Sequence, residues 1–428
     1  MQDGTQVVGK VPNPNAGRAH NTTASEVATM DFARNCLGTP VPRVLAWSSK
    51  ATENPFGAEY IIMEKVAGVP LDKIWASLDI KQRFGVVKSI SRYQRAWMST
   101  AFAEYGSLYY SSDLPNADGC ILTKEDGSQI KEHFFAVGHS TEYGPTTPVA
   151  FGPIRSRPYN PSRAKKAAAL QNYLRLVKFL SPLDHSISCA VLWHPDLHGE
   201  NISVNPEKPW EVLGIIDWQS SELLPLFEQA RQPYFLDYDG PVVEGLDPPP
   251  FPENFDQLDP AEQAEAQSLY MNMSLSALYR RFTCANNERL FRAMGCRQTS
   301  SFEMMLFAHN ILVDGEALYQ SRMLELEEEW QCLPGVQAAG NPPIPIRFSA
   351  DEANSIEEDV VGTIRAMELM RSVKQSLGNL WPEKGVVSPG QYDQVKMLMS
   401  QAKAEIVAPL ASSEQDKVAW EKAWPYDE

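Results

Sequence analysis

Short apolar runs and longer amphipathic stretches divide the chain into a strand-containing beginning and a mostly helical remainder. Residues 7–11 and 57–64 are apolar runs with the length and composition of strands. From residue 71 onward apolar positions recur at helical spacing, most clearly at residues 81–100, which predict a core helix. The pattern therefore predicts an α+β chain in which a small sheet precedes a larger helical part.

The same pattern predicts further helices and the connections between them. A helix that begins near Thr23 should end at Gly38, ahead of Pro40. Residues 105–160 are rich in Gly, Pro, Ser and Tyr and predict a long surface excursion, and Pro-rich residues 245–260 predict a linker. Further helices are predicted at residues 161–180, 261–294, 302–330, 351–379 and 389–424. The acidic residues near the end of the 302–330 segment predict a solvated helix face.

Three apolar runs surround a polar loop in the middle of the chain. Residues 189–193 lead into the loop as a predicted strand, and residues 202–205 leave it as another. Turn residues 205–209 then precede the apolar run 212–216, so the last two strands should form a hairpin. This arrangement predicts that Asp217 lies at a strand end and faces the loop.

The loop carries side chains suited to phosphoryl transfer. It has the sequence His-Pro-Asp-Leu-His-Gly-Glu-Asn over residues 194–201, and Ile-Ile-Asp-Trp-Gln follows at residues 215–219. In a kinase, a loop Asp accepts the proton of the attacking hydroxyl, an Asn binds magnesium, and an Asp on a following strand holds the metals. We assign these roles to Asp196, Asn201 and Asp217, with Asn201 and Asp217 as the metal ligands. The alternative is that they are turn residues that satisfy local backbone groups.

Composition limits the classes of protein to which the chain can belong. Its 428 residues, 43% of them hydrophobic, are enough for two or three lobes with a large core. A net charge of −16 argues against nucleic acid as a partner. Six cysteines without a Cys-x-x-Cys pair are typical of reduced thiols in an intracellular protein, and no apolar run is long enough to predict a membrane span.

The loop and the Ile-Asp-Trp motif resemble those of the aminoglycoside phosphotransferase and choline kinase group of small-molecule kinases, and the loop lacks the Arg of protein kinases. A narrower resemblance is to the fungal phosphotransferase family that includes altered inheritance of mitochondria protein 9. It extends over roughly residues 5–245 and is carried by residues 22–32, 40–47, 57–65, 224–227 and 235–241. The resemblance implies a protein kinase-like two-lobe fold with a small, incomplete antiparallel N-lobe and a large, mostly helical C-lobe that contains the catalytic β-hairpin.

The family pattern also implies domain boundaries and cofactors. Residues 1–66 would form the partial N-lobe, residues 67–245 the catalytic core, and residues 246–428 a helical extension of the C-lobe. ATP would lie between the small lobe and the helical lobe, and Mg²⁺ would be the metal cofactor. We therefore expect two ligands at one site, a nucleotide and a divalent cation.

Nucleotide-binding residues follow from the same resemblance. Lys10 would contact the α- and β-phosphates with Glu26 as its ion-pair partner. The Glu64 carbonyl and the Val66 amide would contact adenine, with Met63 behind the ring. Three alternatives stay open. Lys10 could be a surface lysine, and Glu26 could belong to a capping box that begins at Thr23. Residues 57–64, which are expected to lead into a hinge between the lobes at residues 66–70, could be an ordinary buried edge strand with a turn.

The N-terminus is short for a kinase. Only nine residues precede Lys10, whereas two strands and a phosphate-covering loop precede the corresponding lysine in kinases. We expect the chain to lack this nucleotide-covering part, either because the sequence is truncated or because the protein is a relative without it. No targeting peptide is visible, and we expect an intracellular location in the cytoplasm or the mitochondrion.

The sequence thus predicts an ATP- and Mg²⁺-dependent phosphotransferase that acts on a hydroxyl of a small molecule. The alternative is a catalytically impaired, pseudokinase-like scaffold or mitochondrial assembly protein with the same fold. A protein kinase is disfavoured because no Ala-Pro-Glu motif follows Asp217. Asp237 and Asp239 are predicted to be turn residues, although acidic side chains there could also hold an amine substrate. The acceptor and the oligomeric state stay undetermined at this stage.

Overall fold

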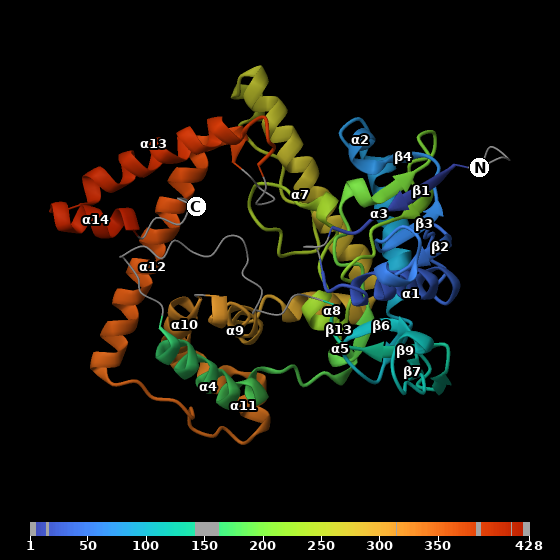
Figure 1. Ribbon diagram of the computed structural model, residues 1–428, viewed down its shortest axis with the longest axis horizontal. Coiled ribbons are helices and arrows are strands. Elements are labelled where there is room, and N and C mark those ends of the chain that lie inside the picture. Colours follow the sequence, from blue (N-terminus) through green and yellow to red (C-terminus); the bar gives the residue numbers. More distant parts are fainter. Residues whose placement is uncertain are drawn as a thin grey trace. The chain divides into compact units, whose positions relative to one another are not determined.

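The computed structural model describes residues 6–13, 17–141, 162–313, 315–381, 387–411 and 413–422. The chain forms two compact units (Figure 1). The first unit comprises Met1–Tyr143 and Asp184–Arg297, and the second comprises Gly144–Leu183 and Gln298–Glu428. The predicted boundaries at residues 66 and 245 stay a prediction.

The first unit begins with a three-stranded antiparallel sheet in the order β1-β3-β2. Its strands are β1 (Val7–Lys10), β2 (Val44–Ser48) and β3 (Tyr60–Glu64), and β3 pairs with both neighbours. Helix α1 (Asn21–Asn35) packs against β2 and β3, and Figure 1 shows it beside the sheet in the blue part of the chain. The register pairs Lys10 with Ile61, so the lysine lies at the end of β1 next to the sheet centre.

The predicted hairpin is present as β11 (Ile202–Val204) and β12 (Val212–Ile215). A short strand at the end of the expected hinge, β4 (Val69–Pro70), pairs with β11 and completes a second three-stranded sheet. Gly68, just before β4, has a φ of 86°, and a Cβ there would lie 2.3 Å from the carbonyl oxygen of Val204. This close approach of two backbones requires glycine at position 68.

The strand that enters the loop belongs to a different sheet from the hairpin. β10 (Ala190–Leu192) pairs with β13 (Leu223–Pro225) and with β5 (Thr100–Phe102), within a five-stranded sheet of order β13-β10-β5-β7-β8. All three β10 residues are buried, as expected of an apolar central strand. The loop therefore connects two sheets, which fixes both of its ends.

The predicted surface excursion contains more regular structure than its composition indicates. Strands β6 (Ser107–Tyr110) and β9 (Phe135–Gly138) form a two-stranded sheet, and β7 (Cys120–Lys124) and β8 (Gln129–Glu132) extend the five-stranded one. Residues 142–160 of the excursion lie outside the described residues. Its aromatic side chains explain the difference, because Phe135 packs edge-on against Phe32 of α1 and so buries one face of the β6–β9 pair.

Helices complete the first unit. After β4 come α2 (Leu71–Trp75) and the core helix α3 (Ile80–Trp97), which ends three residues earlier than predicted because Thr100 belongs to β5. The predicted helix 261–294 is two helices, α7 (Pro260–Asn286) and α8 (Glu288–Cys296), since the Asn287 side chain accepts a hydrogen bond as the N-cap of α8. The short helices α5 (His185–Ser188) and α6 (Leu226–Gln229) flank β10 and β13 in sequence.

Every regular element in the described residues of the second unit is a helix. Its longer helices are α4 (Arg163–Leu180), α9 (Ser300–Ala308), α10 (Glu316–Glu329), α12 (Ala350–Leu377), α13 (Tyr392–Leu410) and α14 (Glu414–Lys422), with the short α11 (Pro334–Ala338) between α10 and α12. The predicted helices 302–330 and 389–424 are thus each interrupted. Two glutamates at the acidic end of α10, Glu325 and Glu329, form ion pairs with Arg322, which also binds Glu303 of α9.

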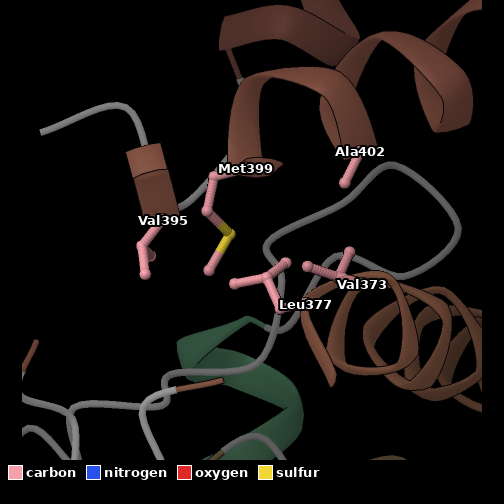
Figure 2. Close-up of a cluster of buried hydrophobic side chains, with 5 residues drawn as sticks. All are labelled: Val373, Leu377, Val395, Met399 and Ala402. Carbon is pink, nitrogen blue, oxygen red and sulfur yellow. The ribbon is translucent and has the colours of Figure 1, made fainter. Parts of the chain in front are cut away.

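Helices α12 and α13 share a small apolar core of their own. Figure 2 shows the side chains that meet there, Val373 and Leu377 from α12 and Val395, Met399 and Ala402 from α13. All five are buried, so their contacts hold the two helices together. Among the helices in the described parts of the chain, none is both long and apolar enough to cross a membrane.

Candidate active site

The polar loop after β10 is folded by hydrogen bonds between its own residues. The side-chain amide of Asn201 donates to the carbonyl oxygen of Asp196 at 2.9 Å, and residues Gly199–Asn201 form one turn of 3₁₀ helix, η3. Asn201 is buried, whereas the Asp196 side chain is 53% exposed. The five-residue spacing therefore brings the Asn201 side chain to the backbone of Asp196, and the Asp196 carboxylate lies at the surface of the loop.

His194 joins the start of the loop to the end of β12. Its Nδ1 accepts a hydrogen bond from the backbone N–H of Asp196 at 3.2 Å, so in the neutral ring Nε2 carries the proton. That Nε2 lies 2.9 Å from the carbonyl oxygen of Ile216, the residue before Asp217. One side chain thus fixes the two backbone segments that carry Asp196 and Asp217.

The surroundings of His194 keep its ring neutral. The ring is buried, and Trp97, Trp193 and Trp218 form an aromatic cluster around it, with centroids 6.4 Å from Trp97 and 4.7 Å from Trp218. Burial lowers the pKa of His194 from 6.5 to about 4, against the opposing effect of its bond to the Ile216 carbonyl. The bridge is therefore made by a neutral imidazole over the whole physiological pH range.

Asp217 follows β12 in a backbone conformation that few residues other than glycine adopt. Its φ is 63°, in the left-handed region that Asp and Asn tolerate better than most residues. Its side chain is half exposed and accepts a hydrogen bond from Lys10 Nζ at 2.9 Å. The turn at Asp217 therefore directs the carboxylate toward the first sheet.

Lys10 lies between two carboxylates. Its Nζ is 2.7 and 3.0 Å from the two carboxylate oxygens of Glu26, which is 4% exposed. Burial lowers the pKa of Lys10, but Glu26 and Asp217 outweigh this effect and raise the pKa above its ordinary value. The lysine is thus held as a cation, and it is not the surface lysine that the sequence also allowed.

The capping-box alternative for Glu26 is wrong. Helix α1 begins at Asn21 rather than near Thr23, its N-cap is His20, and no side chain caps it. Glu26 is therefore inside the helix, and both of its carboxylate oxygens bind Lys10 instead of a backbone N–H group. The ion pair expected from the family resemblance is present, and its role toward phosphates stays a prediction.

A cavity of about 670 Å³ lies between the first sheet and the hairpin, within the first unit. Its lining contains seven of the eight residues that the sequence singled out, namely Lys10, Glu26, Met63, Glu64, Val66, Asn201 and Asp217. Asp196 is not part of the lining and lies on the same loop as Asn201. A second cavity of about 320 Å³, around Arg18 and Glu59, contains none of the eight.

The hinge side of the cavity is apolar and its backbone is partly occupied. Met63 is 8% exposed, and the N–H of Glu64 donates to the carbonyl oxygen of Arg43 across the sheet. The Glu64 side chain accepts hydrogen bonds from the backbone and the guanidinium of Arg43. The Glu64 amide and side chain are thus engaged by Arg43, which leaves the expected adenine contact to the Glu64 carbonyl oxygen.

Sequence reasoning assigned no role to two histidines of the loop, His194, which forms the bridge described above, and His198. His198 Nε2 lies 3.1 Å from a carboxylate oxygen of Asp196 and 3.3 Å from the side-chain nitrogen of Asn201. The only signal in the sequence was its place inside the motif, between the two predicted functional residues. Outside the site, Asp237 binds the side chains of Arg231 and Gln232, which favours the structural interpretation of that carboxylate over an amine site.

A comparison with known protein families covers the part of the chain that carries this site. The phosphotransferase enzyme family model matches residues 2–228, more than half of the chain, and this range includes every residue of the cavity and the loop. The described architecture contains the expected antiparallel sheet with a Lys–Glu pair, the polar loop, and the hairpin that precedes Asp217. The predicted α+β, protein kinase-like fold is confirmed.

Two kinds of curated relatives are similar to this chain. A "Subtelomeric hrmA-associated cluster protein" of Aspergillus fumigatus is 26% identical, over 99% of this chain and 93% of the relative. "Altered inheritance of mitochondria protein 9, mitochondrial" of Lachancea thermotolerans is 23% identical, over 78% of this chain and 63% of the relative. The predicted resemblance to the fungal family with that protein is confirmed, and the chain spans less than two thirds of that relative's length.

Among solved structures, a thermostable mutant of an aminoglycoside phosphotransferase in complex with ADP and hygromycin B is 14% identical. The match covers 85% of this chain and 87% of the other, with a TM-score of 0.31. This score is too low to carry an argument about the site.

Proposed function

The chain belongs to the phosphotransferase enzyme family, and we propose that it transfers the γ-phosphoryl group of ATP to a hydroxyl of a small molecule. The observation that supports this proposal most strongly is the cavity in which a charged lysine near the N-terminus meets an amide and a carboxylate that lie far from it in the sequence, on either side of one hairpin. A lysine and hard oxygen donors around one cavity are what a nucleotide triphosphate with its metal requires. The predicted roles of the eight site residues are part of this proposal.

Lys10 would neutralise charge on the phosphates, with Glu26 holding its ammonium in place. The pair is poised for this because Glu26 is buried inside α1 and binds Lys10 through both oxygens. Lys10 also binds Asp217, and an incoming phosphate would compete for that contact. Adenine would contact the backbone of Glu64 and Val66 with Met63 behind its ring, since these residues line the apolar side of the same cavity.

The residues at the opposite side of the cavity fit a divalent cation. The Asn201 amide nitrogen donates to the Asp196 carbonyl, so the amide oxygen is the atom left for a metal. Asp217 supplies a carboxylate, and oxygen donors are the ligands that Mg²⁺ prefers. When bound, Mg²⁺ would offset the negative charge of the phosphates. Among the described residues no group of three or more His, Cys, Asp and Glu side chains could hold a metal, so phosphate oxygens and water would complete its coordination.

Asp196 is the proposed general base. Its half-exposed carboxylate stands at the surface of the loop, where a hydroxylated substrate has access to it. The carboxylate accepts the hydroxyl proton while the hydroxyl oxygen bonds to the γ-phosphorus. The bond from that phosphorus to its bridging oxygen breaks, and ADP leaves with the electron pair. The proton of the hydroxyl then resides on Asp196, and solvent can remove it after ADP and the phosphate ester are released.

The test of this proposal is transfer of phosphate from Mg-ATP to hydroxylated small molecules, followed by ³¹P NMR. We expect a new phosphate ester with wild type, and a turnover lower by about 100-fold or more in Asp196→Asn with unchanged nucleotide affinity. Asp247→Asn, at a carboxylate that is 87% exposed in a different part of the first unit, is the matched control and should turn over normally. Full turnover by Asp196→Asn would refute the base assignment. Nucleotide binding without transfer to any acceptor would favour the scaffold alternative.

We also propose a mitochondrial rather than cytoplasmic location. The support is the similarity to relatives whose names place them in mitochondria, at 23% identity over 78% of this chain. Fluorescence microscopy of the tagged protein in its own organism tests this, and a diffuse cytoplasmic signal would contradict it.

A further inference from the structure

His198 is the loop residue that the proposed roles leave without a function. It lies between Asp196 and Asn201 in sequence and touches both in space. Its ring Nδ1 is 3.3 Å from the backbone N–H of Glu200, and this contact makes His198 the N-cap of η3. Its ring Nε2 is 3.1 Å from Asp196 Oδ2 and 3.3 Å from Asn201 Nδ2.

These contacts fix the position of the ring proton. A backbone N–H can only donate, so Nδ1 must accept from Glu200, and in the neutral ring the proton is then on Nε2. Asn201 Nδ2 is also a donor, already directed to the Asp196 carbonyl oxygen at 2.9 Å. Two donors cannot satisfy one another, so the acceptor for the Nε2 proton is the Asp196 carboxylate.

We propose that His198 is a positioning residue that donates its Nε2 proton to the Asp196 carboxylate and holds it in the orientation for proton abstraction. The inference rests on the proposed function, because it assigns a role toward the proposed base. The physical need for such a residue follows from exposure. A carboxylate that is 53% exposed samples several rotamers in water, and each one away from the substrate is unproductive. The bond to His198 occupies one carboxylate oxygen and leaves the other for the substrate.

Two substitutions separate the two ring nitrogens. His198→Asn places an amide oxygen near the position of Nδ1, so it keeps the cap on η3 but removes the donor to Asp196. His198→Gln reaches the position of Nε2 with its amide nitrogen, so it keeps the donor and removes the cap. A merely structural role of His198 in the loop predicts that Gln is the more harmful change, whereas our proposal predicts that Asn is.

The first readout is the release of ADP from Mg-ATP with water as the acceptor, together with calorimetric affinity for a non-hydrolysable ATP analogue. We expect His198→Asn to lower kcat by about tenfold or more, with the analogue's Kd within about twofold of wild type. His198→Gln should recover most of the loss. Equal losses in both variants, or wild-type turnover by His198→Asn, would overturn the proposal.

The second readout does not depend on turnover. The ¹⁵N shifts of the histidine rings in the whole chain at pH 8 distinguish a protonated from an unprotonated ring nitrogen, and His198→Gln identifies the signals of this residue. We expect the Nε2–H form, with a proton shift that changes in Asp196→Asn. A ring protonated on Nδ1 would overturn the inference.

The two readouts separate this inference from the proposed function. A wild-type chain that neither binds the analogue nor releases ADP would count against the proposed function, and the ring shifts would still decide whether His198 donates to Asp196.

Discussion

The neutral His194 bridge makes a quantitative prediction about stability and pH. The folded chain holds the pKa of this ring at about 4, whereas an unfolded chain has the ordinary value of 6.5. The folded-state pKa of a base is thus depressed. The stabilisation that comes from keeping the ring neutral is complete above pH 6.5, and it is lost as the pH falls toward 4.

The magnitude follows from the difference between the two pKa values. The difference of about 2.5 units corresponds to about 3 kcal/mol, at roughly 1.36 kcal/mol per unit. The conversion applies without a discount for solvent screening because His194 is only 1% exposed. Within the window from pH 6.5 to pH 4, the unfolded chain binds a proton that the folded chain does not, and the free energy of unfolding falls accordingly.

The assay is urea unfolding of wild type and His194→Gln between pH 4 and pH 7, followed by tryptophan fluorescence, since Trp97 and Trp218 pack against the ring. Gln can donate to the Ile216 carbonyl but has no group that titrates in this range. The difference in free energy of unfolding between wild type and His194→Gln should therefore shrink by about 3 kcal/mol from pH 7 to pH 4, because only wild type loses this stabilisation. A difference in free energy of unfolding between the two proteins that stays constant from pH 7 to pH 4 would refute the reasoning.

Three further predictions concern residues that position the site. Lys10→Met should destabilise the chain at pH 8 by about 3 kcal/mol in urea unfolding, because it leaves the buried Glu26 without its partner; a loss below about 1 kcal/mol would contradict the ion pair. Gly68→Ala should lower the free energy of unfolding by about 2 kcal/mol and weaken nucleotide binding, since the φ of 86° at position 68 and a backbone oxygen 2.3 Å from the new Cβ both oppose a side chain. An unchanged melting temperature and nucleotide affinity would contradict this. Tyr110→Phe should lower the free energy of unfolding by about 1 kcal/mol and accelerate amide hydrogen exchange in α1, because the Tyr110 hydroxyl donates to Asp31 of that helix at 2.8 Å. Unaltered exchange would show that this bond does not stabilise α1.

The local part of the site could be predicted from the sequence because its signals are local. Strands β11 and β12 are joined by a short turn, so their pairing follows from adjacent apolar runs and turn residues. Asp196 and Asn201 are separated by one turn of loop, and that spacing alone brings them together. The Lys10–Glu26 pair was available only through the family resemblance, since spacing also fitted a capping box.

The parts that sequence reasoning missed depend on contacts between distant segments. Strand β10 pairs with β5, about ninety positions earlier, and no periodicity within either strand reveals that partner. Strands β6–β9 lie in a segment whose Gly, Pro and Ser content predicts loops, and their stability comes from aromatic packing against α1. The role of His198 could not be predicted because its tautomer depends on contacts with Asp196, Glu200 and Asn201. The sequence shows only the order of these residues.

The most direct test of the central claim is calorimetric titration of a non-hydrolysable ATP analogue, with and without Mg²⁺, into wild type, Asp217→Ala and the surface control Asp247→Ala. A working phosphotransferase site predicts magnesium-dependent binding by wild type and by Asp247→Ala, and its loss in Asp217→Ala, where the carboxylate that faces Lys10 is missing. No binding by wild type, or equal binding by all three proteins, would contradict the account of this cavity as a metal–nucleotide site.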